Sequence, residues 1–117
     1  MTARRRRGGA FDLAISRRAV WTEYGGRKYR SKGEAGYAAT LDTLKLVGEV
    51  QEWEPQVRIP CVVNGQKVCD YVADFRVRYT DGREEWLDYK GGDTQSAMYR
   101  LKKKLVGACT GIKIREV

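Results

Sequence analysis

The sequence contains no histidine, and this absence excludes several large classes of enzyme. Ser-His-Asp hydrolases, papain-like cysteine enzymes, HNH-type nucleases and most zinc enzymes all need an imidazole group. Catalysis by this chain would therefore have to use carboxylates, lysine, tyrosine, the backbone or a hard metal ion. The chain also lacks a P-loop and a GxGxxG motif, so we expect no nucleotide cofactor.

Cysteine is scarce, and long apolar runs are missing. The three cysteines, Cys61, Cys69 and Cys109, are widely spaced without a CxxC pair, so we interpret them as reduced thiols of the core. No apolar run approaches the roughly 20 residues of a membrane-spanning helix. The arginine-rich start has no apolar segment typical of a secretory signal. These features predict a cytoplasmic protein (in the host cytoplasm if a phage encodes it) with no membrane partner.

Positive charge is what the sequence has in excess. Lysine and arginine number 23 against 15 acidic residues, which gives a net charge of +8. Clustered bases favour a polyanion, since each neutralised phosphate releases condensed counterions. The alternatives are a solvated surface and binding to an acidic membrane. For Arg100, Lys103 and Lys104, a solvated helix face fits as well as contact with phosphate. We predict a nucleic acid as the partner, contacted by Arg4, Arg5, Arg6, Arg7, Arg27, Lys28, Arg30, Lys32, Arg100, Lys103 and Lys104.

Two helices are predicted within a single domain at 13–117, which follows a disordered basic arm at 1–12. The first helix follows Ser31, a good N-cap, and ends before Gly48. The second has Thr94 as its predicted N-cap. Its core stripe is predicted to contain Met98, Leu101 and Leu105.

Strands are predicted at 50–63, 66–79 and 84–90, with a short one at the C-terminal end. Asn64–Gly65 is a typical hairpin turn. The prolines at 55 and 60 should either interrupt the first strand or confine it to a sheet edge. The predicted fold class is therefore α/β in the broad sense (α+β), a mixed sheet flanked by helices in α-β-β-β-α-β order.

The turn after residue 79 decides whether two aspartates meet. A two-residue loop would place Asp74 opposite Tyr89, whereas a three-residue loop with Gly82 in the left-handed conformation would place it opposite Asp88. The second register also puts Phe75 opposite Leu87, so we favour it. Two facing aspartates repel one another unless a cation lies between them, which predicts a site for a hard ion such as Mg²⁺.

Glu34 and Lys90 are the other charged candidates. Lys90 lies one side-chain step beyond Asp88 on the same strand face, where it could orient or deprotonate a water molecule or offset charge on a phosphate. Two roles fit Glu34. In a capping box its side chain would bond back to Ser31, and on the inward helix face it would serve as a catalytic ligand; the S-x-x-E spacing alone favours the capping box.

An ordered set of motifs resembles the PD-(D/E)XK nuclease superfamily, with its restriction-endonuclease-like core. SKGEAGYAATL, EWEPQ, YVADF and WLDYKG are similar to small phage-borne members linked to recombination or replication intermediates, including Holliday-junction-resolvase-like ones. The resemblance covers residues 27–104. It departs from the usual pattern in having Ala73 where the superfamily name has proline, and Asp88 in place of the more frequent glutamate.

The resemblance implies a role for each matching residue. Asp74 and Asp88 would be ligands of Mg²⁺ or Mn²⁺, with Lys90 as the catalytic lysine. Glu34 would be an auxiliary ligand through water, and the backbone carbonyl of Tyr89 would complete the metal shell. Gln56 lies where relatives sometimes carry a polar site residue.

The expected function is that of a metal-dependent DNA endonuclease (a hydrolase) acting on branched or other replication and recombination intermediates. A basic recombination-accessory protein with a degenerate nuclease fold is the alternative. A junction resolvase of an unrelated, aspartate-rich fold is a third possibility, but it would not need the D-x-K motif formed by Asp88, Tyr89 and Lys90. A purely structural role would fit the charge but leave the paired aspartates unexplained. A homodimer would supply the two sites that symmetric cutting needs, whereas one chain holds one.

Overall fold

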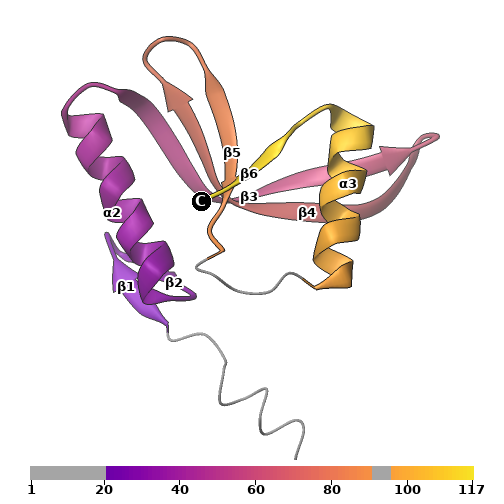
Figure 1. Ribbon diagram of the computed structural model, residues 1–117, viewed down its shortest axis with the longest axis horizontal. Coiled ribbons are helices and arrows are strands. Elements are labelled where there is room, and N and C mark those ends of the chain that lie inside the picture. The colour runs from indigo at the N-terminus through magenta and orange to yellow at the C-terminus, as the bar shows by residue number, and fades with distance from the viewer. Residues whose placement is uncertain (1–20, 91–95) are drawn as a thin grey trace, which may run out of the picture.

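A computed structural model describes residues 21–90 and 96–117 of the chain. The predicted basic arm, with Arg4 to Arg7, and the predicted cap Thr94 lie outside these residues. The helix–three strands–helix–strand order is confirmed, and a small hairpin precedes it (Figure 1). The elements are β1 (Thr22–Tyr24), β2 (Arg27–Tyr29), α2 (Lys32–Leu46), β3 (Val50–Val63), β4 (Gln66–Tyr79), β5 (Glu84–Asp88), α3 (Ala97–Thr110) and β6 (Ile114–Glu116).

The main sheet has the strand order β3-β4-β5-β6. Its first two pairings are antiparallel and the last, between β5 and β6, is parallel, so the sheet is mixed as predicted. β3 runs from Val50 to Val63 and lies at the sheet edge, so the second of the two alternatives predicted from its prolines is confirmed. β3 and β4 form a long hairpin that curves away behind α3, as Figure 1 shows. Its turn is formed by Asn64 and Gly65, both with positive φ, 51° and 78°.

The β4–β5 turn has the predicted three-residue form. The Tyr79 N–H donates to the Arg83 carbonyl at 2.8 Å, and Gly82 adopts φ 95°. Because a positive φ of this kind favours glycine, Gly82 fixes the loop length. The resulting register pairs Phe75 with Leu87 and therefore confirms the predicted alignment of the two strands.

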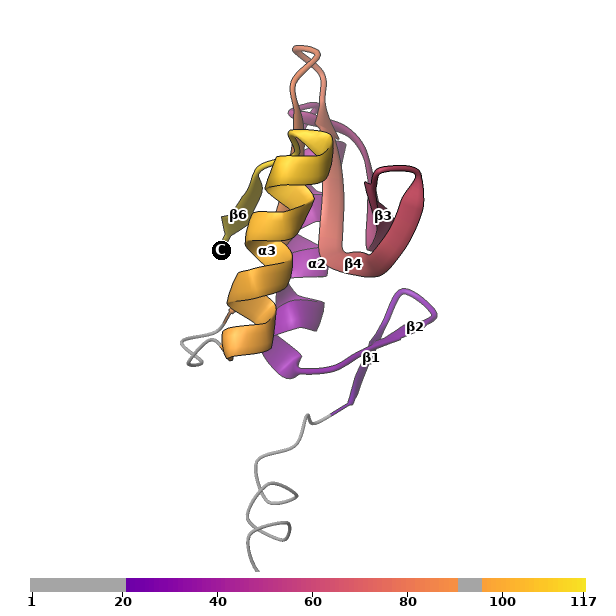
Figure 2. The same ribbon diagram turned by 90° about the vertical axis from the view of Figure 1, so that its right-hand side faces the viewer.

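Two hydrophobic clusters form the core, one under each helix. The α2 cluster contains Leu41, Phe75 and Leu87, and the α3 cluster contains Tyr71 and Val106. Figures 1 and 2 show the two helices on different sides of β5. The end of β5 thus lies between the two clusters, and a side chain there can be reached from both helices.

The caps of α2 are confirmed, whereas two predictions for α3 are wrong. Ser31 accepts the Glu34 N–H at 3.0 Å, and Gly48 follows the helix with φ 87°. Helix α3 begins later than predicted, with Ser96 as its N-cap. Its predicted core residues Met98 and Leu101 are 62% and 61% exposed. The buried face is rotated by about one residue from the predicted one. It includes Val106, which packs against Tyr71 and Ile114 of the sheet.

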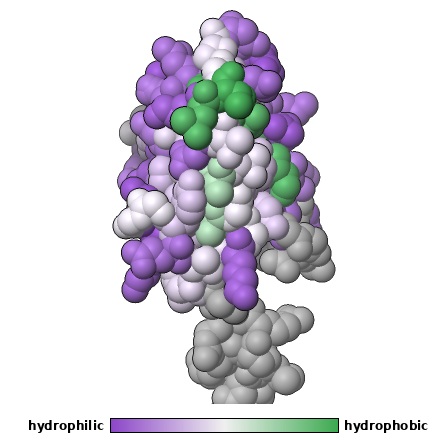
Figure 3. Space-filling view, turned by 90° about the vertical axis from the view of Figure 1, so that its left-hand side faces the viewer, coloured by the Kyte–Doolittle hydropathy of each residue, from purple (hydrophilic) through white to green (hydrophobic). Residues whose placement is uncertain are grey.

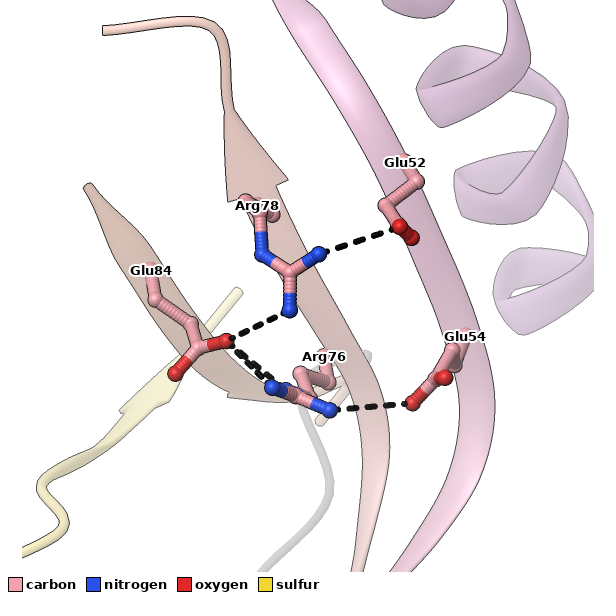
Figure 4. Close-up of polar contacts among 5 residues, drawn as sticks. All are labelled: Glu52, Glu54, Arg76, Arg78 and Glu84. Carbon is pink, nitrogen blue, oxygen red and sulfur yellow. Dashed lines mark hydrogen bonds and ion pairs between the residues drawn. The ribbon is translucent and has the colours of Figure 1, made fainter. Parts of the chain in front are cut away.

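Two surface features of the described residues are a hydrophobic patch and a network of charged side chains. Figure 3 shows hydrophobic side chains gathered near the top, over the end of α2, where Leu46 is 88% exposed. On the outer face of the sheet, alternating charges form a network of ion pairs (Figure 4), so the two arginines of this network are already paired with acids. The network consists of Glu52, Glu54, Arg76, Arg78 and Glu84.

The cysteines are free thiols, as predicted, and Cys61 is buried. Of the helices in the described part of the chain, none has the length and apolar character needed to cross a membrane.

Candidate active site

Asp74 and Asp88 meet where the β4–β5 ladder ends. Their positions follow directly after the Phe75–Leu87 pair. From here the ladder is continued by side chains: the Asp74 N–H donates to Asp88 Oδ1 at 3.1 Å, and the Tyr89 N–H donates to Asp74 Oδ2 at 2.8 Å. Each carboxylate therefore accepts a backbone bond from the opposite strand, which holds the two acids together despite their like charge.

The Asp88 carboxylate is buried, with 3% of the residue exposed. Two tyrosine hydroxyl groups donate to its Oδ2 atom: Tyr71 from β4, and Tyr99 from α3 at 3.0 Å. Burial, followed by the bond to Asp88, raises the pKa of Tyr71 far above its usual range, so this hydroxyl remains a donor. Sequence reasoning missed both tyrosines. The sequence analysis assigned no role to Tyr71, and the misplaced α3 stripe left Tyr99 without a role.

Glu34 is brought to the same place by the first turn of α2. It is 5% exposed, and its Oε2 atom accepts a hydrogen bond from the Gln56 amide at 2.9 Å. The Ser31 half of the capping box is present, but the Glu34 carboxylate points to Gln56. The pKa of Glu34 is raised to about 7. Burial is the largest cause, and the charges of Asp74 and Asp88 add to it, while Arg30 and the Gln56 bond act in the opposite direction.

Gln56 reaches the site because β3 is bent at this residue. The β3–β4 register pairs Pro55 with Phe75 and Val57 with Ala73, so Gln56 lies level with Asp74. Its φ of 51° is a left-handed conformation that is uncommon outside glycine. Such strain within a strand marks a position whose side-chain direction is fixed by its surroundings.

Asp74 also has a perturbed pKa. Burial raises it most, and the charge of Asp88 adds to the increase. The Tyr89 N–H, Lys90 and Gln56 act in the opposite direction, but the net shift is upward. A raised pKa shows that negative charge is crowded in a poorly solvated place, which is where a cation would be most stabilising.

Lys90 is fixed at its backbone and stacked at its side chain. Its N–H donates to the Val117 carbonyl at 3.1 Å, and the Val117 N–H donates to the Asp88 carbonyl at 2.9 Å, which extends the parallel pairing of β5 and β6. The Lys90 Nζ atom lies 3.4 Å from the centroid of the Tyr99 ring. Lys90 is close enough to Asp74 for its charge to lower the pKa of that acid.

Tyr89 packs beneath the first turn of α2, between the acid and the lysine. A Cβ atom built at Gly33 would overlap the Tyr89 hydroxyl and ring, so only glycine fits there without movement. The ring also lies 6.4 Å from that of Tyr37, centroid to centroid. The role expected for the Tyr89 carbonyl stays a prediction.

Two groups of basic residues lie near the elements that form this site. Around the start of α2 the exposed ones are Arg27, Lys28, Arg30 and Lys32; on α3 they are Arg100 and Lys104. Lys103 differs from these, because its Nζ atom lies 3.0 Å from Glu116 Oε2 and its side chain is only 32% exposed. It therefore has an acidic partner within the protein, whereas a phosphate-contacting role had been expected.

The donor set suits a hard divalent cation by its chemistry, since carboxylate oxygens are what Mg²⁺ and Mn²⁺ prefer. Across 21–90 and 96–117, however, no group of three or more histidine, cysteine, aspartate or glutamate side chains is set to hold a metal ion. Glu34 is turned to Gln56 and Asp88 to the tyrosines. Asp74 and Asp88 lie side by side, with Glu34 near them, and binding of a cation by this pair stays a prediction.

Residues 16–109 match the family described as "Protein of unknown function (DUF1064)". No curated protein and no solved structure matches the chain.

Proposed function

Because the chain belongs to the DUF1064 family, a grouping whose description names no activity, we propose a function from the site itself. The proposed function is divalent-metal-dependent hydrolysis of DNA phosphodiester bonds by an endonuclease with a PD-(D/E)XK-type site. The observation that carries it is the end of the β4–β5 pairing, where Asp74 and Asp88 each accept a backbone hydrogen bond from the opposite strand and Lys90 follows Asp88 by two residues.

Each residue has a distinct part in this proposal. Asp74 and Asp88 would hold Mg²⁺ or Mn²⁺, and Glu34 would act on it through water. When bound, the ion would supply Lewis-acid stabilisation of the charge that develops on the phosphate. Lys90 would place its ammonium group beside the scissile phosphate, where it offsets negative charge or exchanges a proton with the attacking water.

The substrate follows from the charge around the site. Exposed bases lie at the start of α2 and on α3, on both sides of the acids, and a duplex or branched DNA could contact both groups at once. Branched replication or recombination intermediates are the proposed substrates, cut in the cytoplasm, by a homodimer where two strands are cut symmetrically.

A cleavage assay tests the proposal directly. Supercoiled plasmid and a synthetic four-way junction are incubated with Mg²⁺, Mn²⁺ or EDTA. We expect cutting that requires metal and falls at least about 100-fold in Asp74→Asn and in Lys90→Met. Asp81→Asn is the matched control, because Asp81 lies in the loop at the other end of the same strands and its side chain is 57% exposed. Equal cutting by wild type and both site variants would refute the proposed site.

A binding-only accessory protein is the second candidate. It is favoured by one observation: both oxygens of the Asp88 carboxylate already accept hydrogen bonds from the protein. Tight, salt-dependent DNA binding in a mobility-shift assay, without cutting in either metal, would support this candidate.

A further inference from the structure

The Asp88 carboxylate is held by more donors than a surface acid would need. Its Oδ2 atom accepts from two phenol hydroxyl groups, those of Tyr71 and Tyr99, and its Oδ1 atom accepts from the Asp74 N–H at 3.1 Å. The donors come from both sides of the site, since Tyr71 and Asp74 belong to β4 and Tyr99 belongs to α3. The carboxylate plane therefore cannot rotate without breaking bonds to two elements.

The two carboxylate oxygens are not equivalent under these contacts. An ionised carboxylate oxygen offers about two lone-pair directions. Two hydroxyl donors occupy both directions at Oδ2, whereas one N–H occupies a single direction at Oδ1. Oδ1 is also the oxygen on the Asp74 side. We propose that Tyr71 and Tyr99 are positioning residues that hold Asp88 by Oδ2 and so leave Oδ1 as the one oxygen with which it binds a cation; this rests on the proposed function.

Tyr99 makes a second contact that links the acid to the lysine. While its hydroxyl donates to Asp88, the face of its ring lies 3.4 Å from the Lys90 Nζ atom. An ammonium group over an aromatic face is held by the negative charge of that face. One side chain of α3 thus contacts both charged ends of the D-x-K segment and sets their separation.

The direction of the Tyr99 hydroxyl follows from a neighbouring ion pair. The hydroxyl has one proton and two acceptors, Asp88 Oδ2 at 3.0 Å and Glu116 Oε2 at 3.1 Å. Glu116 Oε2 is also bonded to the Lys103 Nζ atom at 3.0 Å. This ammonium group offsets the charge of Glu116, so Asp88 is the acceptor to which this proposal assigns the tyrosine proton. This gives Lys103 a structural task that differs from binding phosphate.

Conservative variants separate the two contacts of Tyr99. Tyr99→Phe removes the hydroxyl and keeps the ring, Tyr99→Leu removes both, and Tyr71→Phe removes the other hydroxyl. The matched control is Tyr79→Phe. Tyr79 is on the same strand as Tyr71, and its hydroxyl donates to Glu85 at 2.6 Å, so the control loses the same kind of bond away from the site.

Titration calorimetry with Mn²⁺ measures the inferred effect without relying on cleavage. Bonds to a ligating carboxylate typically contribute 10- to 100-fold to metal affinity. We therefore expect Tyr71→Phe and Tyr99→Phe to weaken Mn²⁺ binding about 10- to 100-fold, while Tyr79→Phe leaves it unchanged. In cleavage assays at saturating metal, the two phenylalanine variants should approach the wild-type kcat. Tyr99→Leu should stay well below it, because Lys90 has lost its aromatic support.

The results distinguish this inference from the proposed function. Mn²⁺ affinity that is lost in Asp88→Asn but unchanged in both phenylalanine variants would overturn the positioning role and leave the metal site intact. Weakened binding in the variants, with no DNA cutting by any form, would support positioning and refute the nuclease. Absence of Mn²⁺ binding by the wild type would refute both. Thermal unfolding checks that each variant folds; should Tyr71→Phe fail, the half-buried Tyr99 still provides the test.

Discussion

Replacing Glu34 with glutamine should stabilise the folded protein at alkaline pH and have little effect in acid. Burial, with help from the charges of Asp74 and Asp88, raises the pKa of Glu34 to about 7, compared with an ordinary value of 4.5. Between these values the folded state keeps a proton that the unfolded chain has released. The free energy of unfolding of the wild type therefore falls as pH rises through this window, and the loss is complete above pH 7.

The size of the effect follows from the same two values. The interval from 4.5 to about 7 corresponds to about 3 kcal/mol of unfolding free energy, at about 1.4 kcal/mol per pH unit. Glu34→Gln removes the ionisable group and keeps an oxygen that can accept the Gln56 bond. In EDTA, we expect the variant to be about 3 kcal/mol more stable than wild type at pH 8 and less than about 1 kcal/mol more stable at pH 5.

Urea unfolding followed by tryptophan fluorescence, at pH 5 and pH 8, measures this difference. A stability gain of equal size at both pH values would refute the electrostatic reasoning, since only a titrating group makes the gain depend on pH. Glu85→Gln is a control for which the expected change in stability has the opposite sign. Burial alone would raise the pKa of Glu85, but the Tyr79 and Arg115 bonds outweigh it and the net pKa is lowered. This variant should lose stability at pH 8.

Two further variants test packing around the site by thermal unfolding and, for the first, by cleavage. Gly33→Ala should displace the Tyr89 ring and reduce cleavage at least tenfold, whereas Gly36→Ala, with open space at the same helix surface, should stabilise α2 by up to about 1 kcal/mol. Asp42→Ala should cost about 2 to 3 kcal/mol, because it leaves the Trp53 indole N–H and a tyrosine hydroxyl without their acceptor. Asp42→Asn, which keeps one acceptor oxygen, should cost about half as much, and equal costs for the two variants would contradict this account.

The local part of the fold was predictable because its signals are local. Ser31 caps a helix by its own hydroxyl, and Asn64–Gly65 can adopt the positive φ values that a tight hairpin needs. The meeting of Asp74 and Asp88 followed from period-two alternation together with one assumption about loop length. That assumption was correct because Gly82 supplies the left-handed residue that a three-residue loop requires.

The missed parts depend on packing between distant segments. The face of α3 toward the sheet is set by where β3, β4 and β6 lie, and apolar character alone selected Met98 and Leu101, which are exposed. Tyr99 was missed for the same reason. Gln56 was named only through the family resemblance. The left-handed bend that turns it inward was not predicted, because the residue there is neither glycine nor proline. Such strain is stabilised by tertiary contacts, which a linear pattern does not contain.

The three-residue turn between β4 and β5 has a consequence for how this protein can change in evolution. Exposed loop tips usually accept insertions and deletions. Here the loop length sets the pairing of β4 with β5, and one added or lost residue would bring Asp74 opposite a different residue and turn every β5 side chain to the other face. We therefore expect the segment from Thr80 to Gly82 to vary in residue type but not in length among active relatives.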